Sequence, residues 1–234
     1  MTEQRPKRRT TKRKTNYKGA ADKKPIELLP RNDKQNAYIE ALNTSSQIIV
    51  TGPAGTGKTY VAATHAASLY NTKEIDKIII TRPHVEVGKG IGFLPGDLNE
   101  KALPWALPVI DVLELHLGKG AVETAIKNGN VEIVPLALIR GRSFDNALII
   151  VDEAQNLTVP EMKAMLTRVG ENSQVILDGD IEQTDLKEQS GLSKIAHLAK
   201  KHSLDMPVIE FGIEDVVRSD ICKAWLKVFH AEGL

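Results

Sequence analysis

The amino-acid sequence predicts an α/β fold in which a mostly parallel sheet is covered by helices on both faces. Six short apolar segments recur along the chain, and helix-like stretches lie between most of them. Most of these segments have consecutive apolar residues, so the strands are expected to be buried on both faces, as in parallel sheets. We expect one domain over residues 25–234, because a chain of 234 residues is long enough for one sizeable core and short for two.

The expected elements follow one another from residue 32. Asn32 or Asp33 can cap a first helix that runs to about Leu42. Strands are expected at 47–51, 77–82, 131–136, 147–152, 174–179 and 207–211. Helices are expected at 58–71, in parts of 97–128, and at 160–169, 191–202 and 214–230. Thr158 and Glu161 have the spacing of a capping box, so the helix near residue 160 has a clear start.

The first 24 residues differ in composition from the rest of the chain. Residues 1–24 carry ten of the 31 Lys and Arg but two of the 30 Asp and Glu, so their charge is about +8 and that of the remainder about −7. They contain almost no large apolar side chains, and we expect a disordered basic tail until an anion binds it. The tail is either an electrostatic arm for phosphate backbones or a solubilising segment, and charge does not separate the two.

The composition also argues against several classes of protein. The single cysteine, Cys222, cannot form an internal disulfide, and no apolar run reaches the roughly 20 residues of a membrane helix. The basic start of the chain lacks the apolar segment of a secretory signal. The six histidines lack metal-ligand spacing, so no structural zinc site is expected. We therefore expect a cytoplasmic protein without a membrane partner.

The sequence GPAGTGKT at residues 52–59 has the pattern of a phosphate-binding loop. It follows an expected strand and opens an expected helix, which is the context that such a loop requires. Its glycines let backbone amides surround phosphates, Lys58 is expected to reach the β- and γ-phosphate oxygens, and the Thr59 hydroxyl to bind Mg²⁺. The alternative is an ordinary glycine-rich turn. The expected ATP-binding residues are Gly52, Pro53, Ala54, Gly55, Thr56, Gly57, Lys58 and Thr59.

Polar residues that follow two other strands complete the expected site. Asp152 is expected to hold Mg²⁺ through its water shell, and Glu153 to orient and polarise the attacking water. Gln183 is expected to contact the γ-phosphate or that water. Taken alone, Asp152 and Glu153 could be an ordinary acidic pair at a strand end, and Gln183 could belong to an ordinary polar turn. Together with the glycine-rich loop, these residues predict Mg²⁺-dependent ATP hydrolysis. Gln35 is a candidate for adenine recognition through its two-sided amide, with a surface glutamine as the alternative.

These motifs lie within longer blocks that resemble the PhoH family of ATPases, single-domain relatives of the motor core of superfamily 1 helicases. The similarity runs from about Pro30 to Phe229 and includes TRPHVEVGKGIGFLPGDLNEK, PLALIRGRSFDNALIIVDEAQN, MKAMLTRVGENSQVILDGDIEQTDL and DVVR. The resemblance implies a RecA-like P-loop NTPase fold, ATP hydrolysis, hexameric rings and a role on RNA. The chain departs from the family pattern at Lys89, where an acidic residue is common, and at Trp105, where tyrosine is common. These departures bear on substrate or partner preference.

A chain with a single domain is expected to take a catalytic arginine from a neighbouring subunit. An arginine that reaches the γ-phosphate accelerates hydrolysis by roughly 10³ to 10⁵. The resemblance assigns this role to Arg218, with Arg168 and Arg142 as alternatives, and a surface salt bridge is the other interpretation of each. We therefore expect a homo-oligomer in the form of a hexameric ring.

A second expected surface binds single-stranded nucleic acid, with RNA favoured over DNA. The Gly- and Pro-rich segment from Pro83 to Gly96 is expected to be a loop beyond a strand end, where ligands bind to open parallel sheets. The candidate contacts are Arg140, Arg142 and loop residues 88–96, including Lys89 and Phe93. Aromatic residues make up 4% of the chain, so stacking is limited to a few positions such as Phe93 and Trp105, each of which also fits the core or an interface.

Three functions remain open on the sequence alone. The leading one is a ring-forming, nucleic-acid-dependent ATPase or helicase. The second is a binding scaffold that responds to ATP with little hydrolysis. The third is a small-molecule kinase, which is disfavoured because Glu153 suits the activation of water and no lid or acceptor pocket is evident.

Overall fold

Six parallel strands form the centre of the protein. The computed structural model describes residues 25–83 and 98–232, and within these ranges the strand order is β3-β2-β4-β5-β1-β6. Every pairing in this sheet is parallel, which confirms the predicted α/β fold class. The strands are β1 (Gln47–Thr51), β2 (Lys77–Thr81), β3 (Val131–Ile133), β4 (Ala147–Val151), β5 (Gln174–Gly179) and β6 (Val208–Glu210).

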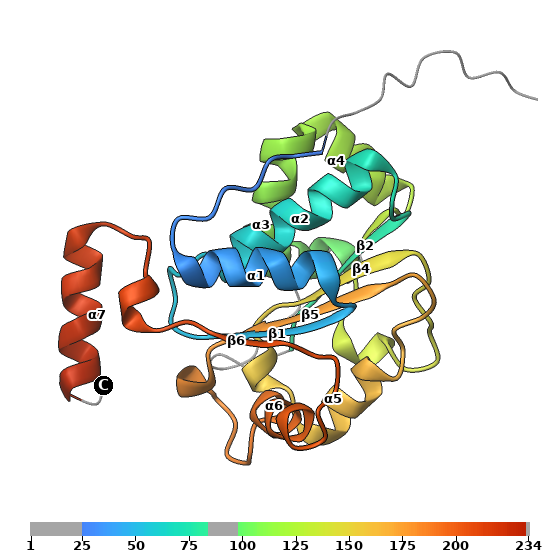
Figure 1. The fold of residues 1–234 in the computed structure, drawn as a ribbon. Helices are drawn as coiled ribbons and strands as arrows, with labels where there is room; N and C mark the ends of the chain where they lie inside the picture. The colour runs from blue at the N-terminus through green and yellow to red at the C-terminus, as the bar shows by residue number, and fades with distance from the viewer. Residues whose placement is uncertain (1–24, 84–97, 233–234) are drawn as a thin grey trace, which may run out of the picture.

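Two helical layers cover the sheet (Figure 1). One face carries α1 (Asp33–Thr44), α2 (Lys58–Thr72), α3 (Leu98–Leu117) and α4 (Lys119–Lys127), and the other carries α5 (Val159–Leu166) and α6 (Gly191–Lys201). In β4, Leu148 and Ile150 belong to the first core, and Ile149 and Val151 to the second. Burying one such side chain stabilises the fold by about 1.5–3 kcal/mol, so a strand buried on both faces requires an uninterrupted apolar sequence.

Local signals set the start of two helices as expected. The Asn32 side chain accepts a hydrogen bond from the Gln35 backbone N–H and caps α1. At α5, the Thr158 hydroxyl accepts from the Glu161 N–H while the Glu161 carboxylate accepts from the Thr158 N–H. The predicted capping box is therefore confirmed.

The expected helix at 214–230 is wrong in its first third. The structure has a short 3₁₀ helix at Ile213–Asp215, and α7 begins only at Asp220 and ends at Glu232. The Val217 N–H between them donates to the Gly55 carbonyl at 2.9 Å, and Asp215 accepts from the Gly212 N–H at 2.8 Å. The Gly212–Asp215 contact caps the 3₁₀ helix, whereas the Val217 contact ties the next residues to the glycine-rich loop, so the chain is extended at Val216 and the helix does not continue.

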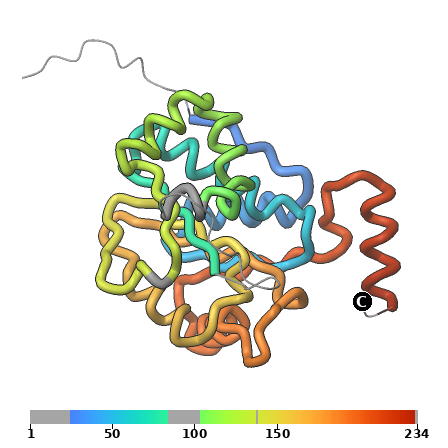
Figure 2. The backbone as a smooth tube through the Cα atoms, turned by 180° about the vertical axis from the view of Figure 1, so that it is seen from behind, coloured from blue at the N-terminus to red at the C-terminus, as the bar shows by residue number. Residues whose placement is uncertain are grey.

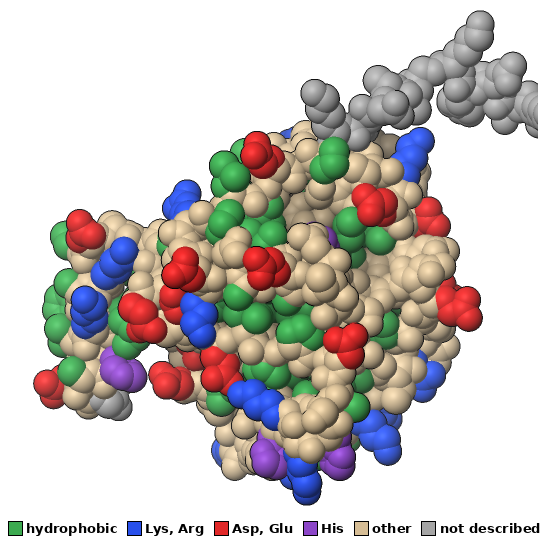
Figure 3. All heavy atoms as spheres, in the orientation of Figure 1, with side chains coloured by type: hydrophobic (Ala, Val, Ile, Leu, Met, Phe, Trp, Pro, Cys, Tyr) green, Lys and Arg blue, Asp and Glu red, His purple; other side chains and the backbone are tan. Residues whose placement is uncertain are grey.

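Helix α7 projects from the body of the molecule (Figures 1 and 2). None of its residues is buried, and it leaves four large apolar side chains exposed. Trp225 and Phe229 stack on one another with ring centroids 5.5 Å apart. Figure 3 shows apolar side chains among charged ones on this projecting part. The exposed side chains are Ile221, Trp225, Val228 and Phe229.

Because all the strands are parallel, their carboxyl ends meet at one edge of the sheet. The glycine-rich loop leaves β1 there, and Arg82, Asp152 and Asp180 follow β2, β4 and β5. Of the predicted loop from Pro83 to Gly96, residues 84–96 lie outside the described residues, as does the predicted tail at 1–24. No helix in the described ranges combines the length and the apolar character needed to cross a bilayer.

Candidate nucleotide-binding site

The glycine-rich loop takes the path that the sequence predicts, from the end of β1 to the start of α2. Gly52 and Gly57 have φ angles of 134° and 89°, which L side chains rarely adopt. A Cβ atom at Gly57 would lie 2.7 Å from the Gln35 side-chain nitrogen, and one at Gly52 would collide with the Phe211 carbonyl. Glycine is therefore required at both positions, and the backbone can wrap closely around a ligand.

Lys58 is the cation of this loop. Its ammonium donates to the Gly52 carbonyl at 2.8 Å and to the Pro53 carbonyl at 3.2 Å. It also lies 4.0 Å from the Asp178 carboxylate, and the residue is 9% exposed. The positive charge is thus held at the loop, next to the amino end of α2, where the helix dipole also favours an anion.

The acidic pair after β4 is held by an arginine that the sequence analysis did not single out. Arg82 lies 3.7 Å from the Asp152 carboxylate and 3.3 Å from that of Glu153. Burial raises the pKa of Asp152, the nearby Arg82 opposes this rise, and Glu153 adds to it. Arg82 directly follows a buried strand, as Asp152 does, and that shared position is the sequence signal that would have found it.

Asp178 is a further carboxyl group in the site, and it is not among the residues predicted from the sequence. It lies on β5, which is hydrogen-bonded to β1 on one side and β4 on the other, so it sits between the loop and Asp152. The Thr59 hydroxyl donates to it at 2.8 Å. Burial raises the pKa of Asp178 to about 7, Lys58 opposes the shift, and Asp152 adds to it. An aspartate inside the apolar run QVILDG was the available signal.

Gln155 connects Glu153 to the segment after β5. Its side-chain nitrogen donates to the Glu153 carboxylate at 2.5 Å and to the Gln183 carbonyl at 3.5 Å. Its side-chain oxygen accepts from the Asp180 N–H at 3.0 Å. Gln183 itself is exposed and lines the same pocket as the acidic pair, and its contact with the γ-phosphate or the attacking water stays a prediction.

Gln35 lies beneath the loop and is 4% exposed, so its interpretation as a surface glutamine is wrong. Its side-chain oxygen accepts from the Arg31 N–H at 2.9 Å, and its nitrogen donates to the Thr56 carbonyl at 2.8 Å. Both ends of the amide therefore support backbone groups. Adenine recognition by Gln35 stays a prediction.

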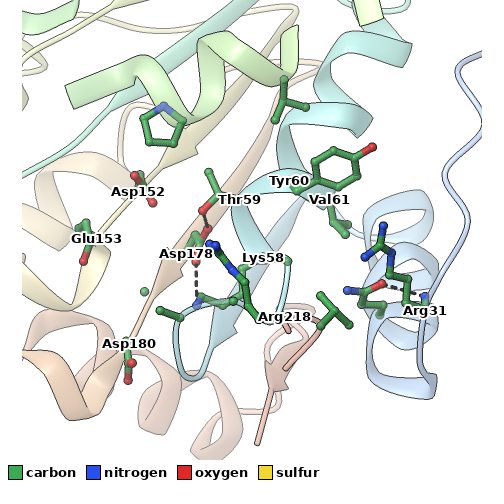
Figure 4. A pocket seen from close by; sticks show the side chains of 18 of the residues that line it. Arg31, Lys58, Thr59, Tyr60, Val61, Asp152, Glu153, Asp178, Asp180 and Arg218 are labelled. Atoms are coloured by element: carbon green, nitrogen blue, oxygen red, sulfur yellow. Dashed lines mark hydrogen bonds and ion pairs between the residues drawn. The ribbon is translucent and has the colours of Figure 1, made fainter. Parts of the chain in front are cut away.

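Arg218 lies beside the loop of its own chain (Figure 4). A Cβ atom at Gly55 would be 2.6 Å from Arg218 Cγ, so the side chain crosses directly over this glycine. This position differs from the expected one, in which a neighbouring subunit supplies the arginine. Neither alternative lines the pocket. Arg142 pairs with Glu132 at 2.6 Å and packs on the Phe144 ring, as in the salt-bridge interpretation, and Arg168 has a buried Nε without a hydrogen-bond partner in the described ranges.

A cavity of about 470 Å³ joins these groups, a size that suits a nucleotide. Figure 4 shows Asp152, Glu153 and Asp180 at one end, and Arg31, Tyr60 and Val61 at the other. Leu28, Leu29, Pro108 and Val112 also line the cavity. The pocket therefore offers polar groups for phosphates and apolar side chains for a base.

The residues present fit a magnesium ion that is shared with phosphates. The described residues contain no cluster of three or more His, Cys, Asp or Glu that could enclose a metal. Mg²⁺ bound with a nucleotide needs few protein ligands, because phosphate oxygens and waters fill most positions. The Thr59 hydroxyl and the Asp152 carboxylate both line the pocket and are the groups that would hold it.

The candidate nucleic-acid surface is only partly described. Arg140 is exposed, whereas Arg142 is engaged by Glu132 and Phe144. Trp105 is half-buried and lines a small hollow together with Arg82 and Asp152, close to the acidic pair. Lys89 and Phe93 lie outside the described residues.

A glycine-rich loop between a central parallel strand and a helix, with an acidic pair after a neighbouring buried strand, defines the class of P-loop ATPase folds. Within this class, the family model described as PhoH-like protein matches residues 27–230. The chain belongs to the PhoH-like family.

The curated relatives agree with this assignment. The protein PhoH of Escherichia coli (strain K12) is 43% identical over 206 residues, which cover 86% of this chain and 58% of that protein. The PhoH-like protein of Bacillus subtilis (strain 168) is 44% identical over 202 residues, which cover 85% of this chain and 63% of the relative. The chain therefore spans less than two thirds of the length of the relatives that it matches.

Two solved structures match the chain more distantly. A crystal structure of Pif1 helicase from Candida albicans matches with a TM-score of 0.41 at 15% identity. The match covers 79% of this chain and 40% of the Pif1 chain. The Sulfolobus solfataricus SWI2/SNF2 ATPase core in complex with dsDNA has a TM-score of 0.43 at 14% identity and covers 69% of this chain and 34% of its own.

Proposed function

We propose that the protein binds ATP together with Mg²⁺ and hydrolyses it. The observation that carries this proposal is the meeting of Lys58, Thr59, Asp152 and Glu153 in one pocket at the amino end of α2. An ammonium and backbone amides bind phosphates, a hydroxyl and a carboxylate hold the metal, and a second carboxylate is left for water.

Each group has one role in the proposed reaction. Loop amides and Lys58 hold the phosphates, and Thr59 and Asp152 hold the metal. Mg²⁺, when bound, neutralises charge on the phosphate oxygens. Glu153 accepts a hydrogen bond from the attacking water, while Gln155 fixes the direction of its carboxylate. Arg82 keeps the acidic pair in place through its contacts with both members.

Arg218 stabilises the charge that develops on the γ-phosphate, and in this proposal it acts within its own chain. Its side chain crosses over Gly55, and the Val217 N–H fastens the same segment to the loop. Gln183 transmits the state of the γ-phosphate to Glu153 through Gln155. The Gln155 side chain donates to the Glu153 carboxylate and to the Gln183 backbone carbonyl.

Single-stranded nucleic acid, with RNA favoured over DNA, is the proposed macromolecular partner. The family resemblance supports this choice, and Arg140, one of the candidate contacts, is exposed. The proposed activity is that of an RNA-dependent ATPase or helicase. The basic segment at 1–24 is proposed as a tail outside the domain at 25–234, and the cytoplasmic location is proposed from composition.

A homo-oligomeric ring is the proposed assembly, and α7 supports it. A helix of 13 residues with no buried side chain is marginal in water by itself. Its exposed apolar face is of the kind that marks interfaces, and α7 starts two residues after Arg218, next to the nucleotide pocket. We propose that α7 packs on a second copy of this chain.

ATP turnover tests the proposal most completely. Wild type, Lys58→Ala and the matched control Lys34→Ala, an exposed lysine on α1, are measured alone, with RNA and with single-stranded DNA. We expect turnover in wild type and control, stimulation by RNA, and loss in Lys58→Ala. Turnover without stimulation would contradict the nucleic-acid part. Nucleotide-dependent assembly that Glu153→Gln leaves unchanged would favour the scaffold, and a phosphorylated small molecule would favour the kinase.

A further inference from the structure

Asp178 and Thr59 form a hydrogen bond between two parts of the chain that are far apart in sequence. The Thr59 hydroxyl donates to a carboxylate oxygen of Asp178 at 2.8 Å, across 119 residues. The bond is possible because β5 lies beside β1, and Val50 is paired in register with Asp178. Asp178 is 1% exposed. The contact is therefore set by the centre of the sheet and not by a surface loop.

Core packing does not explain a carboxyl group at this place. The preceding residues of the strand, Ile176 and Leu177, are fully buried and apolar. A buried carboxyl group costs free energy unless other groups compensate it. Its compensating partners in the structure are Thr59 and the Lys58 ammonium, 4.0 Å away. Both partners belong to the phosphate-binding loop and the first turn of α2, so the position serves that site.

The direction of the hydrogen bond has a consequence for metal binding. A threonine hydroxyl has one hydrogen to donate and two lone pairs. When the hydrogen points to Asp178, the lone pairs of Thr59 stay available on the other side of the oxygen. A cation binds only to lone pairs. In a helix, a threonine without such an acceptor tends to donate to a carbonyl of the preceding turn, which turns its oxygen away.

We propose that Asp178 is a positioning residue for magnesium, which accepts the Thr59 hydrogen and thereby aims the Thr59 oxygen at the ion. The proposal rests on the proposed function, because it concerns the metal that accompanies ATP. Asp178 acts through Thr59 and not as a ligand. It adds to the roles that the sequence assigned to Thr59 and Asp152.

The test measures binding of a fluorescent ATP analogue in EDTA and in increasing Mg²⁺, so that no turnover is needed. In Asp178→Ala, we expect the Mg²⁺ concentration for half-maximal effect to rise at least about 10-fold, which is about 1.4 kcal/mol. Affinity in EDTA should not fall by more than about 3-fold, since the metal plays no part there. Asp178→Asn keeps an oxygen acceptor and should stay within about 3-fold of wild type in Mg²⁺ response.

A double-mutant cycle separates positioning from a general effect of charge. Thr59→Val removes the hydroxyl, so adding Asp178→Ala to it should change the Mg²⁺ response no further. Additive losses would overturn the proposal, as would an unchanged Mg²⁺ response in Asp178→Ala. An Asp178→Asn variant that behaves like Asp178→Ala would assign the effect to charge and overturn it too.

Two further outcomes keep folding and function apart. A merely structural role would lower the melting temperature and the affinity in EDTA of Asp178→Ala together, and that result would also overturn the proposal. Wild type that binds no nucleotide would overturn the proposed function and this inference with it. If wild type binds the nucleotide with Mg²⁺ and Asp178→Ala has the same Mg²⁺ response, only the inference about Asp178 would be overturned.

Discussion

Replacing Gln35 with alanine distinguishes support of the phosphate-binding loop from recognition of adenine. Gln35 is 4% exposed. Its side-chain oxygen accepts a hydrogen bond from the Arg31 N–H at 2.9 Å, and its side-chain nitrogen donates one to the Thr56 carbonyl at 2.8 Å. Leaving a buried backbone group unpaired costs about 1–3 kcal/mol. Water can reach the Arg31 side of this contact, since that residue is exposed, so we expect the free energy of unfolding to fall by about 2–3 kcal/mol in total.

Binding should change with stability, because the Thr56 carbonyl belongs to the loop itself. We expect the affinities for ATP and GTP to fall by the same factor, which leaves their ratio as in wild type. The assays are urea unfolding and equilibrium titration with each nucleotide. Asn36→Ala is the matched control, because Asn36 is exposed and its side-chain amide donates to Glu40, four residues along the same helix.

One result would contradict support of the loop by Gln35. If Gln35→Ala has the same free energy of unfolding as wild type and loses affinity for ATP but not for GTP, the Gln35 amide recognises the adenine base and does not support the loop. Adenine recognition would then be correct as first predicted from the sequence.

Four other predictions address the site, the assembly and the effect of pH. Glu153→Gln should keep ATP affinity within about 3-fold and lower turnover by about 10²–10⁴, measured by phosphate release; equal turnover would remove Glu153 from the reaction. Arg218→Ala should lower turnover by about 10³ with binding intact, and mixing it with Lys58→Ala subunits should restore nothing because Arg218 acts within its chain; recovery on mixing would place it in a neighbour's site. Trp225→Glu should reduce the mass found by analytical ultracentrifugation without lowering the melting temperature, whereas an unchanged mass would exclude the α7 contact. Burial raises the pKa of Asp178 to about 7, so the stability linked to its protonated form is present below its unfolded pKa of about 3.9 and is lost as pH rises through about 7. Between about pH 5 and about pH 8, the free energy of unfolding should therefore fall more in wild type than in Asp178→Asn. Parallel pH profiles of the two proteins would contradict this.

Much of the fold follows from the sequence because its signals are local. A strand buried on both faces needs an apolar run, and all six runs became strands, although β3 ends at Ile133 rather than at residue 136. The caps at Asn32 and Thr158 depend on residues three positions away, so they are readable in the sequence. The glycine-rich loop is likewise a continuous segment of eight residues.

The parts that the sequence did not predict depend on contacts between distant segments. The pairing of Arg82 with Asp152 and Glu153 requires β2 and β4 to be neighbours, and the bond from Thr59 to Asp178 requires β5 beside β1. No single segment of the sequence determines which strands are neighbours in the sheet. The helix expected from residue 214 failed for the same reason, because the Gly55 carbonyl captures the Val217 N–H and keeps the chain extended.

Calorimetric titration of ATP into the purified protein with excess Mg²⁺ shows whether the glycine-rich loop binds a nucleotide. We expect saturable binding to wild type and binding at least about 10-fold weaker to Lys58→Ala, since a hydrogen bond to a charged group contributes about 1.5–3 kcal/mol. Wild type that takes up no purine nucleotide under these conditions, or Lys58→Ala that binds as tightly as wild type, would contradict it.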